Sequence, residues 1–179
     1  MSINFEPLGV NDEEAGYIGI VACFVSSVFC LLISYITDHL RKHMKVTLVV
    51  LLVLETLSWT WLAMICDKII PFSTWQLYAA TVCGTSFTFS LAPLFFEYSS
   101  ELAYPVPEGL VGGFLTCFNN LIGGIFLAIF FIPNIGTTWM NYVLVASAVV
   151  SIPAVIFTKE SYRRLDIDDP TNPYFEVNA

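Results

Sequence analysis

The chain has 179 residues and a net charge of −8, and its composition is far more apolar than that of a water-soluble domain. Hydrophobic residues make up 56% of the sequence and charged residues only 12%, about half of the roughly 25% found in ordinary globular domains. The acidic residues gather near the two ends, and no basic or aromatic pattern suits a phosphate backbone. This composition excludes nucleic-acid binding and indicates an integral membrane protein in contact with the lipid bilayer.

Five stretches are each long and apolar enough to cross the hydrocarbon core of a bilayer, which takes roughly 20 residues per helix. In chain order, the predicted spans cover residues 17–36, 46–65, 75–96, 110–132 and 139–158. A polar segment over residues 97–109 separates the third and fourth spans, and Pro105 and Pro107 are expected to prevent a helix there. The sequence therefore predicts an all-α membrane protein with five transmembrane helices.

Lysine and arginine residues are distributed unequally between the two ends of these spans. Only Lys68 falls on one side, whereas the other side receives Arg41, Lys42, Lys45, Lys159, Arg163 and Arg164. Positive residues close to span ends stay in the cytosol. Residues 1–16 are therefore predicted to form a luminal or extracellular segment, residues 17–158 the transmembrane domain, and residues 159–179 a cytosolic tail.

Glu55 is the one charged residue of the second predicted span and lies near its middle. A carboxylate at the bilayer centre costs about 2.5–3.5 kcal/mol on insertion scales, so it should face a cavity or a partner. Burial disfavours the charged form of a carboxyl group, so a carboxyl group at this position can take up and release a proton. We interpret Glu55 as a proton-coupling or cation-binding site, with a structural hydrogen bond to a neighbouring helix as the alternative.

Polar residues in two other spans are further candidates for a solute or proton pathway. Asn119 and Asn120 lie in mid-span between glycine pairs, where amides either contact a substrate or bond neighbouring helices. The third span has a partly polar face, a candidate cavity wall, formed by Thr85, Ser86, Thr88 and Ser90. The five cysteines have neither disulfide nor metal-ligand spacing, and no nucleophile–base set occurs. We therefore predict neither an enzyme nor a cofactor or metal site.

Two loop segments resemble solute carriers of the major facilitator superfamily. Residues 34–42 resemble the loop that joins paired helices in that superfamily, without its two glycines. Residues 101–109, Glu-Leu-Ala-Tyr-Pro-Val-Pro-Glu-Gly, resemble the Glu-x-x-Tyr-Pro-x-x-Glu-Gly stretch between the tenth and eleventh helices of solute carrier family 49. Residues 112–120 and 159–162 extend this resemblance, which covers about residues 5–165.

That resemblance implies a larger parent fold. Members of the family have twelve spans in two halves, and this chain matches helices eight to twelve, a partial C-terminal half of a major facilitator bundle. The implied partner is a missing N-terminal half. The implied activity is proton-coupled transport (symport) of a small organic solute. The branch that matches best implies export of pyridoxine (vitamin B6) from lysosomes, and other members handle choline or haem.

The lysosomal membrane is accordingly favoured over the plasma membrane. The alternative to transport is a truncated or non-transporting membrane subunit, because the chain matches only part of the family's fold.

Three acids of the polar segment are predicted to line the cytosolic rim of the bundle that the resemblance implies. Glu97, Glu101 and Glu108 would lie there and could pair with Arg41 or Lys42 of the basic loop, in which Asp38 is a further gate candidate. Ion pairs between them would hold one conformation and release in the other, which is a gate. Ordinary surface pairing, worth under about 1 kcal/mol, is the alternative interpretation.

A reporter domain fused after Ala179 tests the predicted topology. Because five spans and the positive residues place the C-terminus in the cytosol, we expect cytosolic reporter signal from the fusion. The same orientation would expose the Tyr-x-x-hydrophobic pattern of Tyr174 and Val177, which endosomal sorting adaptors read, to the cytosol. A luminal signal would contradict both the topology and the sorting motif.

Overall fold

The computed structural model describes residues 12–39, 43–71, 73–129, 131–132 and 138–159. These residues form five helices: α2 (Asp12–His39), α3 (Met44–Cys66), α4 (Thr74–Leu102), α5 (Glu108–Ile129) and α6 (Thr138–Phe157). All five are long and apolar enough to cross a membrane, and the described residues include no strand. The predicted all-α, multi-pass membrane fold is therefore confirmed. Arg41, Tyr174 and Val177 lie outside the described residues, as does the side chain of Asp38.

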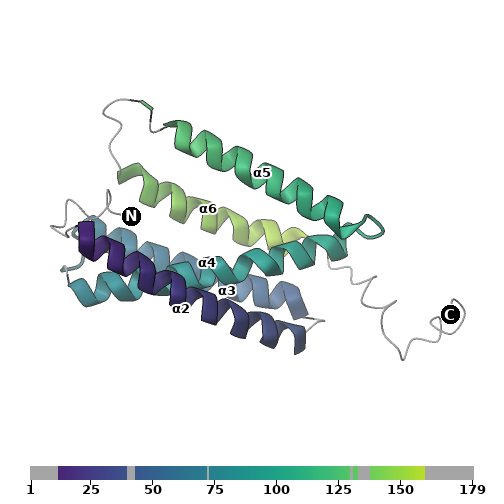
Figure 1. The fold of residues 1–179 in the computed structure, drawn as a ribbon, viewed down its shortest axis with the longest axis horizontal. Coiled ribbons are helices and arrows are strands. Elements are labelled where there is room, and N and C mark those ends of the chain that lie inside the picture. Colours follow the sequence, from purple (N-terminus) through teal and green to yellow (C-terminus); the bar gives the residue numbers. More distant parts are fainter. Residues whose placement is uncertain (1–11, 40–42, 72, 130, 133–137, 160–179) are drawn as a thin grey trace, which may run out of the picture.

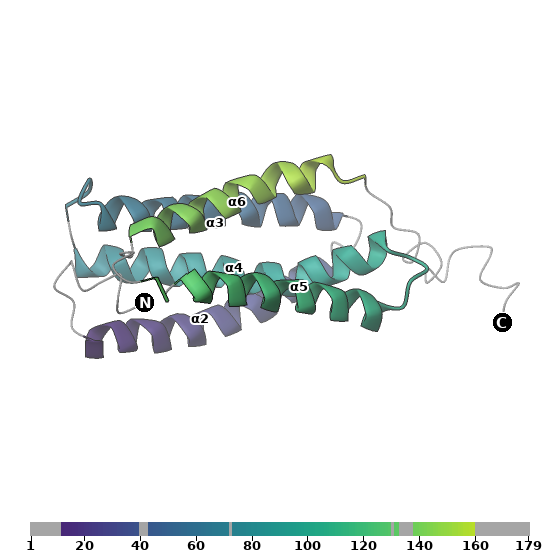
Figure 2. The ribbon, with the colours of Figure 1, turned by 90° about the horizontal axis from the view of Figure 1, so that it is seen from above.

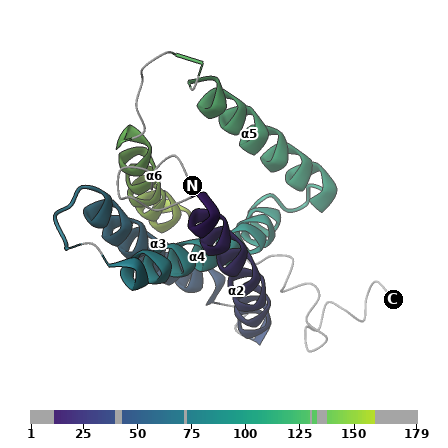
Figure 3. The ribbon, with the colours of Figure 1, turned by 60° about the vertical axis from the view of Figure 1, so that its left-hand side comes forward.

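Helix α4 lies at the centre of the bundle. It packs against α2 and against α3, and α3 in turn packs against α6 (Figure 1; Figure 2). Helix α5 makes its main contact with α4 and stands apart from the other helices (Figure 3). Half of the most apolar stretch of α3 is buried inside the molecule, whereas none of the most apolar stretch of α5 is buried. The packed unit is therefore α2, α3, α4 and α6, with α5 attached at its edge.

The apolar core of this unit is divided into two clusters. One joins the start of α2, the end of α3 and the start of α4 through Ile18, Trp59, Leu62, Ile65, Leu77 and Ala80. The other joins the start of α3 to the ends of α4 and α6 through Met44, Leu48, Leu51, Leu52, Leu91, Leu94, Tyr98 and Val155. Between them, at mid-helix, lie the buried polar side chains of Ser26, Glu55 and Ser86. The middle of the bundle is thus its most polar level.

The third helix is longer than the sequence predicted. We expected a loop over residues 97–109, but α4 continues to Leu102 and α5 begins at Glu108. The two prolines at 105 and 107 restrict the backbone only close to themselves, so the residues upstream of them remain helical. As a result Glu101 is buried, with 4% of its surface exposed, whereas Glu97 and Glu108 are exposed. Glu101 is therefore less accessible than Glu97 and Glu108, and its role at the rim stays a prediction.

Close approach between α3 and α4 depends on Gly84. A Cβ atom at this position would lie 3.0 Å from Cε2 and 3.1 Å from Cδ2 and Cζ2 of the Trp59 indole. Trp59 itself is only 7% exposed, so its ring has little room to move away. The indole of α3 therefore rests directly on the backbone of α4, and the absence of a side chain at Gly84 permits it.

Substituting Gly84→Ala tests this packing. We expect the added methyl group to push the indole aside and lower the free energy of unfolding by about 1–3 kcal/mol, the usual cost of overpacking. The measurement is thermal or denaturant unfolding of the purified protein in detergent. The matched control is Gly124→Ala on α5, where an added Cβ meets nothing within 4 Å, so no loss is expected. Equal stability of the two variants would contradict the packing argument.

Candidate functional site

Two residues of α3 meet two residues of α4 at the polar level of the bundle. Glu55 and Trp59 are four residues apart, as are Gly84 and Thr88, so each pair occupies one face of its helix. Thr88 Oγ1 lies 2.6 Å from Glu55 Oε1 and 2.9 Å from the carbonyl oxygen of Gly84. The indole N–H of Trp59 donates a hydrogen bond of 3.3 Å to the same hydroxyl oxygen. We call Glu55, Trp59, Gly84 and Thr88 the Glu55 quartet.

The carboxyl group of this quartet borders a cavity between α3, α4 and α6. The cavity has a volume of about 240 Å³. Its polar lining consists of Glu55, Thr88 and two hydroxyls of α6, Ser147 and Ser151. Its apolar lining consists of Leu52, Leu91, Ala92, Phe95, Leu144 and Ala148. Because pockets for drug-sized ligands usually measure about 300–1,000 Å³, this cavity suits water, a proton or a small ion.

Polar contacts join α3 and α6 near the two ends of these helices. At one end, Lys45 Nζ donates a hydrogen bond of 2.9 Å to the carbonyl oxygen of Thr158, just after α6 ends. A cation at the C-terminal end of a helix is also favoured by the helix dipole. At the other end, the Tyr142 hydroxyl donates a bond of 2.7 Å to Asp67 Oδ2. These two contacts fix the separation of α3 and α6 on either side of the polar level.

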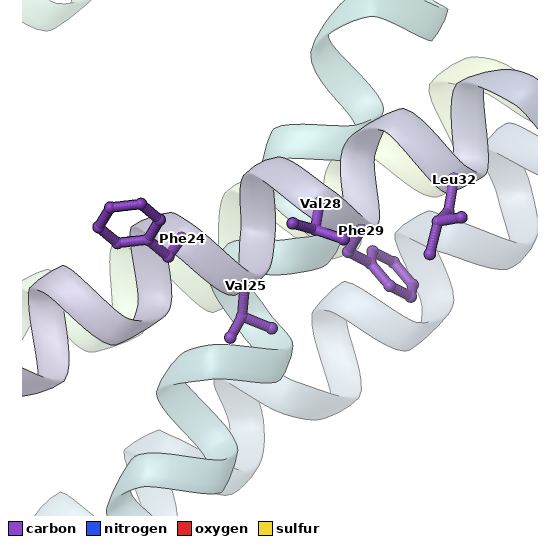
Figure 4. A pocket seen from close by; sticks show the side chains of 5 residues that line it. All are labelled: Phe24, Val25, Val28, Phe29 and Leu32. Atoms are coloured by element: carbon purple, nitrogen blue, oxygen red, sulfur yellow. The ribbon is translucent and has the colours of Figure 1, made fainter.

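A larger hollow, of about 400 Å³, lies on the outer face of α2 and has a different character. Its lining residues are Phe24, Val25, Val28, Phe29 and Leu32, all on α2 (Figure 4). None of these side chains carries a hydrogen-bonding or charged group, so the hollow has no means of orienting a polar solute. Its chemistry matches that of lipid acyl chains, and we do not assign a solute site there.

The predicted pathway residues do not all gather at the cavity. Thr85 and Ser86 point to α2 instead, where their hydroxyl oxygens lie 3.1 Å and 3.2 Å from Ser26 Oγ. That contact matches the helix-bonding role known for hydroxyls in membrane helices. Asn119 and Asn120 are exposed on α5 and do not line the cavity. Of the predicted residues, Glu55 and Thr88 therefore border the cavity.

Three further residues of the site were found only by the structure: Trp59 beside Glu55, and Ser147 and Ser151 in the cavity lining. Trp59 lies near the end of its predicted span, a position typical of an interface anchor, yet it is buried beside Glu55. The sequence did not indicate Ser147 and Ser151 as site residues, because isolated serines are common in apolar spans. Their spacing of four residues was a usable signal, since it places both hydroxyls on one face of α6.

Comparison with known proteins supports the resemblance drawn from the loop sequences. The chain is 28% identical over 165 residues to the solute carrier family 49 member 4 homolog of Xenopus laevis, and equally to that of Xenopus tropicalis. Each alignment covers 90% of this chain but 36% of the relative, so the chain spans about a third of their length. No protein-family model matches the chain. The expected similarity to solute carrier family 49, and within it to the fourth member, is confirmed over nearly the whole of this multi-pass membrane protein.

Proposed function

We propose that this chain forms part of a transporter for a small organic solute and that Glu55 is its proton-binding residue. The observation that carries the proposal is a carboxyl group, 8% exposed, in the middle of a membrane-spanning helix and beside a cavity. Acids at such positions are costly to insert and are found mostly along ion, proton and substrate pathways. The curated relatives are named as solute carriers rather than as enzymes, which supports the same class of activity.

The cavity favours a proton over a whole solute molecule. Its volume of about 240 Å³ is small, and its polar groups are one carboxyl group and the hydroxyls of Thr88, Ser147 and Ser151. Among the described lining residues there is no lysine, arginine or histidine to serve as a fixed counter-ion. Proton uptake by Glu55 would therefore change the net charge of the cavity by itself, which is what couples a proton gradient to a conformational change.

The solute would bind elsewhere, between this chain and a missing N-terminal half. Transporters of this general kind hold substrate near the bilayer midplane, at the interface of two halves that rock against each other. Helix α5 offers Asn119 and Asn120 in mid-span on an exposed face, where they would contact the solute or that half. By similarity to the fourth family member, the first solute to test is pyridoxine, exported from lysosomes, followed by choline and haem.

The exposed acids at the end of α4 and the start of α5 would form the cytosolic gate. Glu108 borders a hollow of about 230 Å³ with Ser100, Tyr104, Pro105, Val106 and Pro107. Glu97 is exposed on the last turns of α4. We propose that these acids pair with the basic loop around Asp38 and Arg41 in one conformation. In this topology the Tyr174 motif of the tail would be read in the cytosol and direct the protein to lysosomes.

A second candidate function is a non-transporting membrane subunit. It is favoured by α5, in which no residue is buried. In that role the exposed face of α5 would bind another membrane protein, and Glu55 would only join α3 to α4 through Thr88. The two candidate functions differ in one measurable property: only the transporter would take up a solute in response to a pH gradient.

A chimeric transporter separates them. In the Xenopus laevis relative, the aligned segment is replaced by this chain, and uptake of pyridoxine, choline and haem into proteoliposomes is measured with and without a pH gradient. We expect the chimera to take up one of these solutes in a gradient-dependent manner. Glu55→Gln, which keeps the size and a hydrogen bond but cannot ionise, should leave uptake independent of the gradient.

The matched control is Glu14→Gln, which removes an exposed acid at the start of α2 and should leave gradient dependence unchanged. This chain reconstituted alone should give no uptake if the missing half is required. A folded chimera that transports none of the three solutes, whereas the unmodified relative does transport one, would support the subunit role. Gradient-dependent uptake that survives Glu55→Gln would remove Glu55 from the mechanism.

A further inference from the structure

The Thr88 hydroxyl has more hydrogen-bond partners than an ionised Glu55 would allow it to satisfy. A hydroxyl group donates one hydrogen bond and accepts two. Three groups surround Thr88 Oγ1: the Trp59 indole N–H at 3.3 Å, the Gly84 carbonyl oxygen at 2.9 Å and Glu55 Oε1 at 2.6 Å. The indole can only donate and the carbonyl can only accept, so the protonation state of Glu55 decides whether all three bonds form.

Counting donors and acceptors distinguishes the two states. If Glu55 is ionised, its oxygen and the Gly84 carbonyl compete for the single hydroxyl proton of Thr88. If Glu55 is protonated, its O–H donates to Thr88 Oγ1, the indole donates to the second lone pair, and the Thr88 O–H donates to Gly84. All three contacts are then satisfied at once. The arrangement is complete only around the neutral acid.

From this geometry we infer that Thr88 is the positioning residue that reports the protonation of Glu55 to helix α4. When Glu55 loses its proton, the Thr88 hydroxyl rotates from the Gly84 carbonyl oxygen to Glu55 Oε1, and the direction of the Glu55–Thr88 hydrogen bond reverses. One proton leaves Glu55, no covalent bond of Thr88 changes, and the indole of Trp59 donates to Thr88 Oγ1 in both states. This inference rests on the proposed role of Glu55 as a proton site.

The surroundings leave Thr88 as the principal route for such a signal. The described residues that line the cavity include no titratable group other than Glu55; α4 contributes Thr88 and apolar side chains, and α6 contributes Ser147 and Ser151. Helix α2 meets α4 through the separate contacts of Ser26 with Thr85 and Ser86. Trp59 and Gly84 are in close contact, so a change at the Thr88 hydroxyl acts on a tightly packed junction.

Trp59 provides the spectroscopic signal that tests the inference. Hydrogen bonds in a chain polarise one another, so a hydroxyl that donates to a carboxylate accepts the indole N–H more strongly. We expect the indole proton resonance of Trp59, in the full chain with labelled tryptophan in lipid nanodiscs, to move to lower field as pH rises. Its midpoint should equal that of the isotope-edited carbonyl absorption of the Glu55 side chain. The Trp139 resonance, from a different helix, serves as the internal reference.

Three variants make the test specific. In Glu55→Gln the Trp59 resonance should no longer depend on pH. In Thr88→Val, Glu55 should still titrate but the Trp59 resonance should stay fixed, and Thr88→Ser, which restores the hydroxyl, should restore the pH-dependent movement. A purely structural role of Thr88 would change the stability of Thr88→Val without removing the link between the two midpoints.

The outcomes distinguish a failure of the inference about Thr88 from a failure of the proposed proton site at Glu55. A titrating Glu55 with a Trp59 resonance that does not move, or that moves equally in Thr88→Val, would overturn the role of Thr88 alone. A carbonyl absorption of Glu55 that is independent of pH would overturn the proton site, and with it the inference. Coincident midpoints that are lost in Thr88→Val and regained in Thr88→Ser would establish Thr88 as the positioning residue.

Discussion

A carboxyl group in the middle of a lipid-embedded helix must find hydrogen-bond partners inside the protein, and the packed part of this molecule is arranged around that requirement. Glu55 receives its partner from α4, because Thr88 lies 2.6 Å away. Thr88 is in reach because the two helices approach closely where Gly84 admits the Trp59 indole. A bulkier residue at Gly84 would separate α3 from α4 and remove the partner of the acid. The hydrogen bond that the buried Glu55 needs therefore depends on the small size of Gly84.

The remaining helices meet a different requirement at the same level. Helix α6 forms one wall of the cavity and lines it with Leu144 and with three small residues, Ser147, Ala148 and Ser151. The bonds from Lys45 to Thr158 and from Tyr142 to Asp67 hold its two ends against α3. Two apolar clusters above and below the polar level supply most of the packing. The cavity between α3 and α6 thus lies between two polar contacts at the ends of these helices.

The sequence predicted the spans well and the faces of the helices poorly, for physical reasons. Hydropathy over about 20 residues measures how well a segment matches the hydrocarbon core of the bilayer, so all five spans were found. A lone acid such as Glu55 stands out within such an apolar segment. Hydropathy does not mark where a helix stops, which is why the extension of α4 to Leu102 and the burial of Glu101 were missed. Nor does it say which neighbour a hydroxyl faces. Thr85 faces α2 and Thr88, three residues later, faces α3, and only packing decides between them.

The positions of Glu55, the proposed proton site, and of the exposed polar face of α5 constrain any coupling between them. Glu55 lies between α3, α4 and α6, whereas Asn119 and Asn120 lie on α5, whose main contact in the bundle is with α4. A transporter built on this fold must therefore pass the effect of protonation through α4. That helix carries Thr88 on the side of the acid and Phe96 against Gly112 of α5 further along. Two turns of one helix separate these contacts, so a small rotation or bend of α4 would act on both.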